Sequence, residues 1–557
     1  MAKSPVMEAR REQMFPVLDD LDIARLKRFG EPRHYPPGSM IMKAGEIPPG
    51  LVLVLKGNIA VVQGGAFASG EAIVEYGPGQ FLGELAQLSD RPALVDATAS
   101  ADVDAVVIPP RCLRDVLVKE AELGERLMRA LILRRVGLLE MGQAGPILIG
   151  KSGSADMLRL ETFLSRNGHP HRSLDAATDN CARTLVTRFQ VAESDLPIVL
   201  CPGGQLLKNP SESELARCVG LLKSIDPNRI YDTVIVGAGP SGLAASVYAT
   251  SEGLSALVLD CRSFGGQAGA SARIENYFGF PTGITGLALT ARAYNQAQKF
   301  GVEMAIPDEV LVMEPQVVGE PTRLRLASGE TVRAHAVVIA SGADYRKLAT
   351  PRLAEFEMSS VHYWASPIEA RLCAAADVAL VGAGNSAGQA AVFLASHARS
   401  VTVLVRGSGL EATMSRYLVD RIGGLPNVEV QARTEVVALE GGDGVLEALR
   451  LRTGNGAETR RPFRHLFCFI GAEPKAAWLA GSGVALNPKG FVLTGRDAGP
   501  GERQTLETSQ PGVFAIGDVR LGSTKRVSAA VGEGAQVIAA VHAYLAAAHV
   551  GAAAPVT

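Results

Sequence analysis

The sequence predicts a multidomain protein: an antiparallel β-roll followed by a helix, a small α/β domain, and two nested Rossmann-like α/β domains. Its 557 residues exceed the roughly 150 residues of an ordinary domain several times over. Short β-type runs broken by glycine fill the first part of the chain. Two glycine-rich loops, 237–242 and 382–387, each follow an apolar run and open an alanine-rich segment. A strand, tight turn and helix N-terminus hold a diphosphate on backbone N–H groups, so two such loops predict two dinucleotides and electron transfer.

The charge and hydrophobicity of the chain limit the kinds of partner that it is expected to bind. Charged residues make up 20% of the chain and the net charge is −2, so no long-range field gathers nucleic acid or anionic lipid. No run approaches the roughly 18 apolar residues of a membrane helix, and the N-terminus lacks an apolar signal region. We therefore expect a cytoplasmic protein without nucleic-acid or membrane partners. The seven cysteines are never spaced C-x-x-C, so neither a disulfide framework nor a metal site is predicted.

The first predicted domain spans residues 15–140. After its β-type runs comes Gly83-Glu84-Leu85-Ala86, where the segment resembles the cyclic nucleotide-binding domain family. The resemblance implies phosphate binding by the N–H groups of the turn at Gly83 and Leu85, and a ribose contact from Glu84. The family places an arginine after a proline to pair the phosphate, but Ala93 follows Pro92 here and Arg91 precedes it. Arg91 is the candidate replacement, and a roll kept for structure or for another ligand is an equal alternative.

The helix expected after the roll carries an apolar stripe at helical spacing. Its members are Leu113, Val116, Leu117, Leu123, Leu127, Leu131 and Leu138. In the same family such a helix packs on its own roll or on a partner chain. A homodimer is expected from the second arrangement.

Residues 145–223 alternate strand and helix patterns, with Leu196-Pro197 ahead of an apolar run. The order resembles the thioredoxin and glutaredoxin family, and Pro197 is the candidate cis residue. That family's redox motif would fall at 151–154, which reads Lys-Ser-Gly-Ser. Because no cysteine is present there, we expect a docking or spacer role.

The remaining residues, from about 230 onward, carry both glycine-rich loops. Asp260 ends the strand after the first loop, where an acid bonds a ribose 2′-OH, which predicts FAD. Arg406 holds the equivalent position after the second loop and favours the 2′-phosphate of NADPH, with NADH as the alternative if this arginine is only solvated. The predicted loop contacts are Gly237, Gly239, Pro240, Ser241 and Gly242 for FAD, and Gly382, Gly384, Asn385, Ser386 and Ala387 for NAD(P)H.

Five motifs in this part closely resemble thioredoxin reductase. They are 265–267, 274–281, 340–343, 469–474 and 517–519. The resemblance implies a nested architecture, in which an FAD domain of residues 230–343 and 474–557 is interrupted by an NAD(P)H domain of residues 344–473. It also implies flavin contacts from Gly266, Gln267 and Asn276 and ribityl contacts from Gly517 and Asp518. It also places Lys525, Arg526 and Val527 at the flavin edge.

The chain departs from that family where its redox cysteines should stand. The stretch entering the NAD(P)H half, 361–369, holds no cysteine pair. Trp364 is a candidate flavin cover or a packing residue, and Cys373 is expected to pack a helix. No catalytic side chain is assigned with certainty.

These patterns predict an FAD-dependent NAD(P)H oxidoreductase that passes electrons to an unknown acceptor without an internal dithiol. Regulation through the N-terminal domain is a further expectation. The alternatives are an enzyme like ferredoxin- or flavodoxin-NADP reductase, a thioredoxin-disulfide reductase of atypical route, and a redox or ligand sensor that does not turn over.

Overall fold

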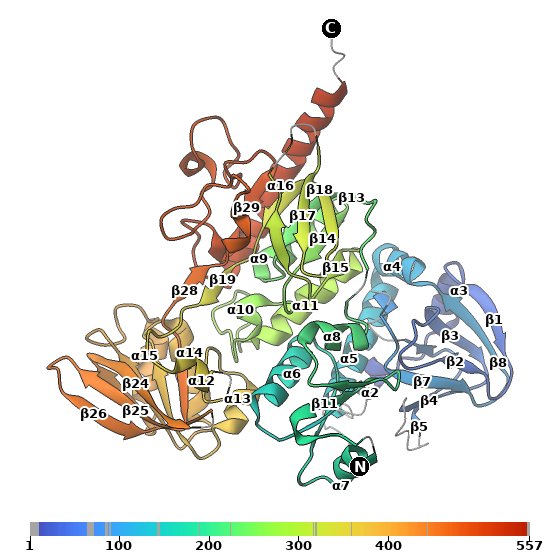
Figure 1. Cartoon of the computed structure of the whole chain (residues 1–557). Helices are drawn as coiled ribbons and strands as arrows, with labels where there is room; N and C mark the ends of the chain where they lie inside the picture. Colours follow the sequence, from blue (N-terminus) through green and yellow to red (C-terminus); the bar gives the residue numbers. More distant parts are fainter. Residues whose placement is uncertain are drawn as a thin grey trace.

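The computed structural model describes residues 10–63, 72–83, 87–88, 91–141, 145–188, 190–222, 224–315, 317, 320–357, 359–442 and 444–553. The chain forms four units, of which the NAD(P)H half is inserted within the FAD half (Figure 1). The small α/β domain lies between the N-terminal roll and the NAD(P)H half. The FAD half lies above it in the view, with the C-terminal helix projecting away. Among the described helices, none is long and apolar enough to span a membrane.

The N-terminal roll consists of two four-stranded antiparallel sheets, as the glycine-punctuated runs predict. One sheet has the order β1 (Glu31–Tyr35), β8 (Val103–Ile108), β3 (Leu51–Lys56), β6 (Phe81–Leu82), and the other β2 (Met40–Met42), β7 (Val95–Ala99), β4 (Ile59–Gln63), β5 (Ala72–Tyr76). Helices α2 (Arg11–Met14) and α3 (Asp20–Lys27) precede them, and α4 (Pro110–Lys119) and α5 (Ala121–Met141) follow. The stripe on α4 and α5 is buried against the roll, since Leu113 to Leu131 of the stripe cluster with Leu51, Leu53 and Phe81 and Leu138 packs into the cluster around the second sheet, so it covers its own roll. The homodimer stays a prediction, but the apolar stripe does not support it, because the stripe is buried within its own domain.

The small α/β domain has a four-stranded sheet in the order β10-β9-β11-β12, with β9 and β10 parallel and the other pairs antiparallel. Its elements are β9 (Ile147–Gly150), α6 (Ala155–Arg166), β10 (Arg172–Asp175), α7 (Asn180–Arg188), β11 (Ile198–Leu200), β12 (Leu206–Lys208) and α8 (Glu212–Cys218). The Leu196–Pro197 peptide bond is cis, as expected.

A disulfide joins Cys201 to Cys218 in this domain, with 5.9 Å between the Cα atoms. The sequence predicted no disulfide framework, and this single disulfide was not anticipated. Cys201 follows β11 and Cys218 ends α8, and a spacing of 17 residues gives no local signal. Only the packing of α8 on the sheet brings the two thiols together.

The FAD half is built from two separate segments of the chain, one before and one after the NAD(P)H half. Its main sheet has the order β15-β14-β13-β18-β17-β16, and β29 pairs in parallel with β18. The strands are β13 (Ile230–Val236), β14 (Ala256–Leu259), β15 (Glu303–Ala305), β16 (Val310–Met313), β17 (Thr322–Leu326), β18 (Thr331–Ile339) and β29 (Val513–Ala515). The helices are α9 (Pro240–Ser251), α10 (Gly266–Gly269), α11 (Gly286–Lys299) and α16 (Val527–Ala553). Pairing of β29 with β18 shows the nesting directly.

The NAD(P)H half is inserted through a two-stranded crossing of β19 (Ala343–Tyr345) and β28 (Ala472–Pro474). Its parallel sheet has the order β20 (Val361–His362), β27 (His465–Cys468), β21 (Asp377–Val381), β22 (Ser400–Val405), β23 (Val428–Ala432). Helices α13 (Pro367–Leu372), α14 (Asn385–Ala395) and α15 (Arg416–Gly423) pack beside it, and β24 (Thr434–Gly442), β25 (Val445–Thr453) and β26 (Glu458–Pro462) form a separate sheet. The two predicted Rossmann-like folds are confirmed.

Candidate cofactor sites

The first glycine loop joins β13 to α9 in a turn that requires glycine. Gly237 has φ +117°, and a Cβ there would lie 2.1 Å from the carbonyl oxygen of Ala340. A Cβ on Gly242 would lie 1.8 Å from the carbonyl oxygen of Gly237. Gly239 is the N-cap of α9 and has no such contact, so the helix N-terminus stays open. This geometry suits a diphosphate, whose charge the first-turn N–H groups and the helix dipole stabilise.

Asp260 fixes the loop from the end of β14. Its Oδ2 accepts a hydrogen bond from the Ala238 N–H at 2.9 Å. Its Oδ1 accepts from the N–H groups of Arg262 at 3.0 Å and Ser263 at 3.2 Å. The predicted ribose-binding acid therefore stands beside the glycine loop and also holds its backbone in place.

The turn at 265–267 packs directly on that loop. The Gly265 N–H donates to the Ala238 carbonyl at 2.7 Å. A Cβ on Gly266 would lie 3.1 Å from the Cα of Gly239, and the Gln267 side chain donates to the Ala343 carbonyl. The structure thus gathers the predicted contacts Gly266 and Gln267 at the helix N-terminus. Asn276 lies on an exposed loop, and no contact within the described residues links it to this cluster.

The C-terminal motif reaches the same helix from the other side. A Cβ on Gly517 would lie 2.6 Å from the Ser241 Oγ, so Gly517 closes on the first turn of α9. Burial raises the pKa of Asp518, with Lys525 opposing the shift and Glu533 adding to it. The Lys525 ammonium lies 5.2 Å from the Phe491 ring centroid. Arg526 is exposed, and Val527 begins α16. The converging loop, acids and helix end fit FAD.

The second glycine loop repeats the turn in the NAD(P)H half. Gly382 has φ +143°, and a Cβ there would lie 2.5 Å from the Phe469 carbonyl oxygen. Gly384 is the N-cap of α14, whose first turn contains the predicted residues Asn385, Ser386 and Ala387. The Asn385 side chain is already engaged, since it accepts from the Ser415 N–H at 2.7 Å.

Arg406 lies just beyond β22, at the same sheet edge as this loop. It is exposed, and within the described residues it makes no ion pair. Its charge is therefore available to a phosphate. The donor set fits a reduced nicotinamide dinucleotide.

Trp364 packs among protein groups at the junction of three units. Its indole N–H donates to Glu369 at 3.0 Å, and its ring lies 6.4 Å from that of Tyr345. The Arg166 guanidinium from the small domain lies 5.8 Å from the indole. These contacts match the packing alternative for Trp364, and the flavin-cover role stays a prediction.

The segments 151–154 and 361–369, where the family resemblances imply redox cysteines that the chain lacks, face one cavity of about 330 Å³. Ser152 and Gly153 line it from the small domain, and Ile368 and Arg371 line it from α13 of the NAD(P)H half. The rest of the lining is Leu158, Glu161, Ser165, His171, Ser173 and Leu372. Sequence reasoning treated the two segments separately, because nothing in the chain signals that the domains meet there.

The two free cysteines of the NAD(P)H half are buried. Burial raises the pKa of Cys373 to about 12, with Glu369 adding to the shift. Burial likewise raises the pKa of Cys468 to about 12. Neither thiol supplies a thiolate near neutral pH, so Cys373 is the packing residue that was predicted.

The roll departs from its predicted ligand site. Glu84 and Leu85 lie outside the described residues, and Ala93 is 2% exposed in the core. The structure places Arg91 elsewhere: its guanidinium donates to the Tyr294 hydroxyl of α11 at 2.5 Å and lies over that ring. Arg91 therefore faces helix α11 of the FAD half.

Arg134 of α5 is the cation beside Gly83, and the sequence analysis missed it. It is buried and donates to the carbonyl oxygens of Phe81 at 2.9 Å and Gly83 at 3.0 Å. One arginine among the polar residues of a helix carries no signal of burial, so only the packing reveals it.

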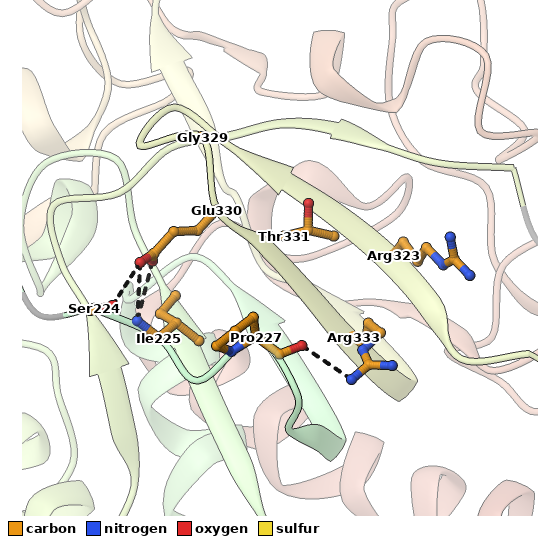
Figure 2. Close-up of a pocket in the computed structure, with 8 residues that line it drawn as sticks. All are labelled: Ser224, Ile225, Pro227, Arg323, Gly329, Glu330, Thr331 and Arg333. Atoms are coloured by element: carbon orange, nitrogen blue, oxygen red, sulfur yellow. Dashed lines mark hydrogen bonds between the residues drawn. The ribbon is translucent and has the colours of Figure 1, made fainter.

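A larger cavity of about 550 Å³ lies at the linker ahead of β13 (Figure 2). Glu330 accepts from the Ser224 hydroxyl at 3.1 Å and the Ile225 N–H at 3.3 Å, and Arg333 donates to the Pro227 carbonyl at 3.1 Å. These bonds anchor the linker to β18 and to the turn that precedes it. The cavity is lined by none of the predicted cofactor residues.

Comparison with known families agrees with this geometry. Residues 231–534 match the family model of pyridine nucleotide-disulphide oxidoreductases. Residues 32–120 match the model of the cyclic nucleotide-binding domain. The matched ranges coincide with the two cofactor halves and with the roll.

Curated relatives and solved structures carry the same likeness. NADPH-dependent thioredoxin reductase 3 of Arabidopsis thaliana is 31% identical over 62% of this chain, which spans 65% of that protein's length. The thioredoxin reductase of Mycoplasmopsis pulmonis is 32% identical over 55% of this chain and 95% of its own length. The crystal structure of Lactococcus lactis thioredoxin reductase in its FR conformation is 26% identical, with TM-score 0.52, over 57% of this chain and 99% of that one.

Proposed function

Because the chain belongs to the pyridine nucleotide-disulphide oxidoreductase family and is thioredoxin reductase-like, we propose that it oxidises NADPH through FAD without an internal cysteine pair. Electrons then leave the flavin for an acceptor that is not a bound dithiol of this chain. The observation that carries the proposal is the cysteine-free segment 361–369 at the entrance to the NAD(P)H half. The nearest thiol beyond it, Cys373, is buried with its pKa raised to about 12.

The chain's own residues bind and orient the cofactors. The helix N-termini at Gly239 and Gly384 would hold the two diphosphates. Asp260 and Asp518 would bond hydroxyl groups at the two ends of FAD, which fixes the flavin relative to the NAD(P)H half. When bound, FAD supplies the two-electron chemistry between the nicotinamide and the acceptor.

The small domain supports an acceptor other than thioredoxin. Its strand and helix order is the one expected of a thioredoxin-like domain, and we interpret it as a relative of that fold without cysteines at the redox-motif position. Ser152 and Gly153 stand where its redox motif would fall, and they face α13 across the shared cavity. This domain therefore occupies the face beside 361–369 without offering a motif disulfide at 151–154 to reduce.

Control through the roll is a second candidate property, and one chain of contacts favours it. The Tyr294 ring that receives Arg91 stacks on Phe264 at 4.4 Å. Phe264 directly precedes the 265–267 turn at the first glycine loop. A conformational change of the roll at Arg91 would thus be transmitted to the first glycine loop through the rings of Tyr294 and Phe264.

Reductive titration tests the absence of a flavin-linked dithiol. With dithionite, the flavin absorbance should bleach after about two electrons per FAD, because no disulfide shares electrons with it. Any further uptake should come from Cys201–Cys218 and disappear in Cys201→Ser. Four-electron uptake that persists in Cys201→Ser and is lost in Cys373→Ser would contradict the proposal.

Turnover separates an enzyme from a sensor. We expect steady NADPH oxidation with small-molecule acceptors such as quinones, and no reduction of added thioredoxin beyond the rate without enzyme. A protein whose flavin is reduced once by NADPH but never turns over with any acceptor would be a sensor instead.

A further inference from the structure

Arg166 ends helix α6 of the small domain and enters the FAD half. Its Nη2 donates to the Gly266 carbonyl at 2.8 Å, and its guanidinium lies 5.8 Å from the Trp364 ring. The side chain is largely buried, and within the described residues no carboxylate lies within ion-pair distance of it. A cation removed from water normally has an anionic partner, because the lost hydration is otherwise uncompensated.

The acids near Arg166 are already committed to other groups. Glu212 pairs with the neighbouring Arg262 at 2.8 Å. Asp260 accepts three backbone hydrogen bonds in the glycine loop and the turn after it. Burial, and then the like charge of Arg262, lower the pKa of Arg166, while Tyr345, Asp260 and Glu212 oppose the shift. No carboxylate within the described residues forms an ion pair with the guanidinium, so it remains without a direct anionic partner.

The carbonyl that Arg166 contacts belongs to the turn on the first glycine loop. Gly265 is hydrogen-bonded to Ala238, and Gly266 packs on Gly239 at the N-terminus of α9. This helix end is the place where the loop geometry favours a diphosphate. The buried cation and the anion site thus meet at the same turn.

The small domain holds Arg166 there by two neighbouring contacts. The Asn167 side chain donates to the Arg262 carbonyl at 3.1 Å, and the Glu212–Arg262 ion pair joins α8 to the same loop. Both contacts are made to Arg262, in the segment that follows Asp260. The position of Arg166 therefore depends on docking of the small domain against this segment.

We propose that Arg166 is a cofactor-positioning residue, delivered by the small domain to the diphosphate of FAD at the Gly266 turn. This inference rests on the proposed function, because it requires FAD in the first glycine loop. It gives a role to the small domain, which has no cysteine at its redox-motif position: the domain completes the charge balance of the FAD site. FAD binding and docking of this domain then reinforce one another.

The test measures binding by the full-length apoprotein rather than turnover. Arg166→Gln should weaken FAD and ADP binding about tenfold to a hundredfold, the usual effect of losing a charged hydrogen bond. Adenosine, which has no phosphate, should bind both proteins equally when measured by competition with FAD. Arg172→Gln, an exposed arginine on β10 of the same domain, is the matched control and should bind all three ligands like wild type.

Arg166→Lys keeps the charge and should recover most of the lost FAD affinity. Equal FAD affinity in wild type and Arg166→Gln, or an adenosine loss as large as the ADP loss, would overturn the inference, since the second result means a disturbed loop. Equal losses in the Lys and Gln variants would also overturn it. Failure of the wild type to bind FAD at all would instead refute the proposed function.

Discussion

Asp260 shows how one side chain serves both the fold and the site. The sequence predicts it as a ribose-binding acid at the end of a strand. In the structure its two oxygens also accept backbone N–H groups on both sides of β14, from Ala238 and from Arg262 and Ser263. Its loss should therefore remove a ribose contact and loosen the glycine loop at once.

We predict that Asp260→Ala weakens FAD binding by about 1–3 kcal/mol, the cost of leaving polar partners unpaired. Fluorescence titration of the apoprotein with FAD measures it. Asp497→Ala, an exposed acid in the same half, is the control and should leave the affinity unchanged. Unaltered FAD affinity in Asp260→Ala would remove this residue from the site.

Arg406 decides between the nicotinamide cofactors in our proposal. NADPH should be preferred over NADH, and Arg406→Ala should raise the KM for NADPH with little change in kcat, because the 2′-phosphate contact is the same in ground and transition states. Arg464→Ala is the control, since this exposed arginine precedes β27 at the opposite sheet edge. Equal kcat/KM for NADPH and NADH in the wild type would count against the assignment.

At the scale of elements, the parallel sheet of the NAD(P)H half contains a buried histidine pair. His362 Nε2 of β20 lies 3.2 Å from His465 Nδ1 of β27. Burial lowers the pKa of His362 from 6.5 to about 3, and His465 adds to the shift. Burial also lowers the pKa of His465. Both rings are therefore neutral in the native sheet.

This pair should make the NAD(P)H half sensitive to acid. Between pH 6.5 and about 3 the unfolded chain binds a proton at His362 that the native sheet excludes. Stability should therefore fall as the pH drops through this window, by up to about 1.4 kcal/mol per pH unit for one site. Urea unfolding at pH 7 and pH 5 should show a smaller pH effect in His362→Gln. The same pH dependence in both proteins would show that other groups are responsible.

The roll folds although Ala93 stands where the cyclic nucleotide-binding family has the arginine that pairs with the phosphate. The absence of this arginine should weaken the affinity for cyclic nucleotides about tenfold to a hundredfold. Arg91 does not replace it here, because its guanidinium is hydrogen-bonded to Tyr294. We predict no saturable cyclic AMP or cyclic GMP binding at low micromolar concentration, and no change in NADPH oxidation when either is added. Calorimetry with each cyclic nucleotide measures this binding. Tight one-to-one binding would mean that another cation binds the phosphate, and Arg134, which contacts Gly83, would be the first candidate.

At the scale of the whole molecule, the small domain connects the other units. It meets the roll at Gly220, where an added Cβ would lie 2.4 Å from the Pro92 ring. It meets the FAD half at Arg262 and Gly266, and the NAD(P)H half at Trp364 and α13 (Figure 1). A domain that has no cysteine at 151–154 thus contacts every other unit of the protein. A change in how this domain docks should therefore alter the conformation of all three other units.

Sequence alone determined the elements and the cofactor loops. Alternating apolar runs with glycine turns predict the roll, and strand–glycine loop–helix patterns predict both Rossmann halves, because these signals are local and repeat within a few residues. The missing cysteines at 151–154 and 361–369 are equally plain in the sequence. The nested order came from motif resemblance, and the pairing of β29 with β18 shows it directly.

Only the tertiary structure decided what these pieces do to one another. The Cys201–Cys218 disulfide depends on the packing of α8 within the small domain, and the contact of Arg91 with Tyr294 and the insertion of Arg166 beside Gly266 depend on packing between domains. The residues in these contacts differ from ordinary surface residues only in their surroundings. Side-chain burial and charge compensation are properties of the assembled molecule, so no local pattern could have carried them.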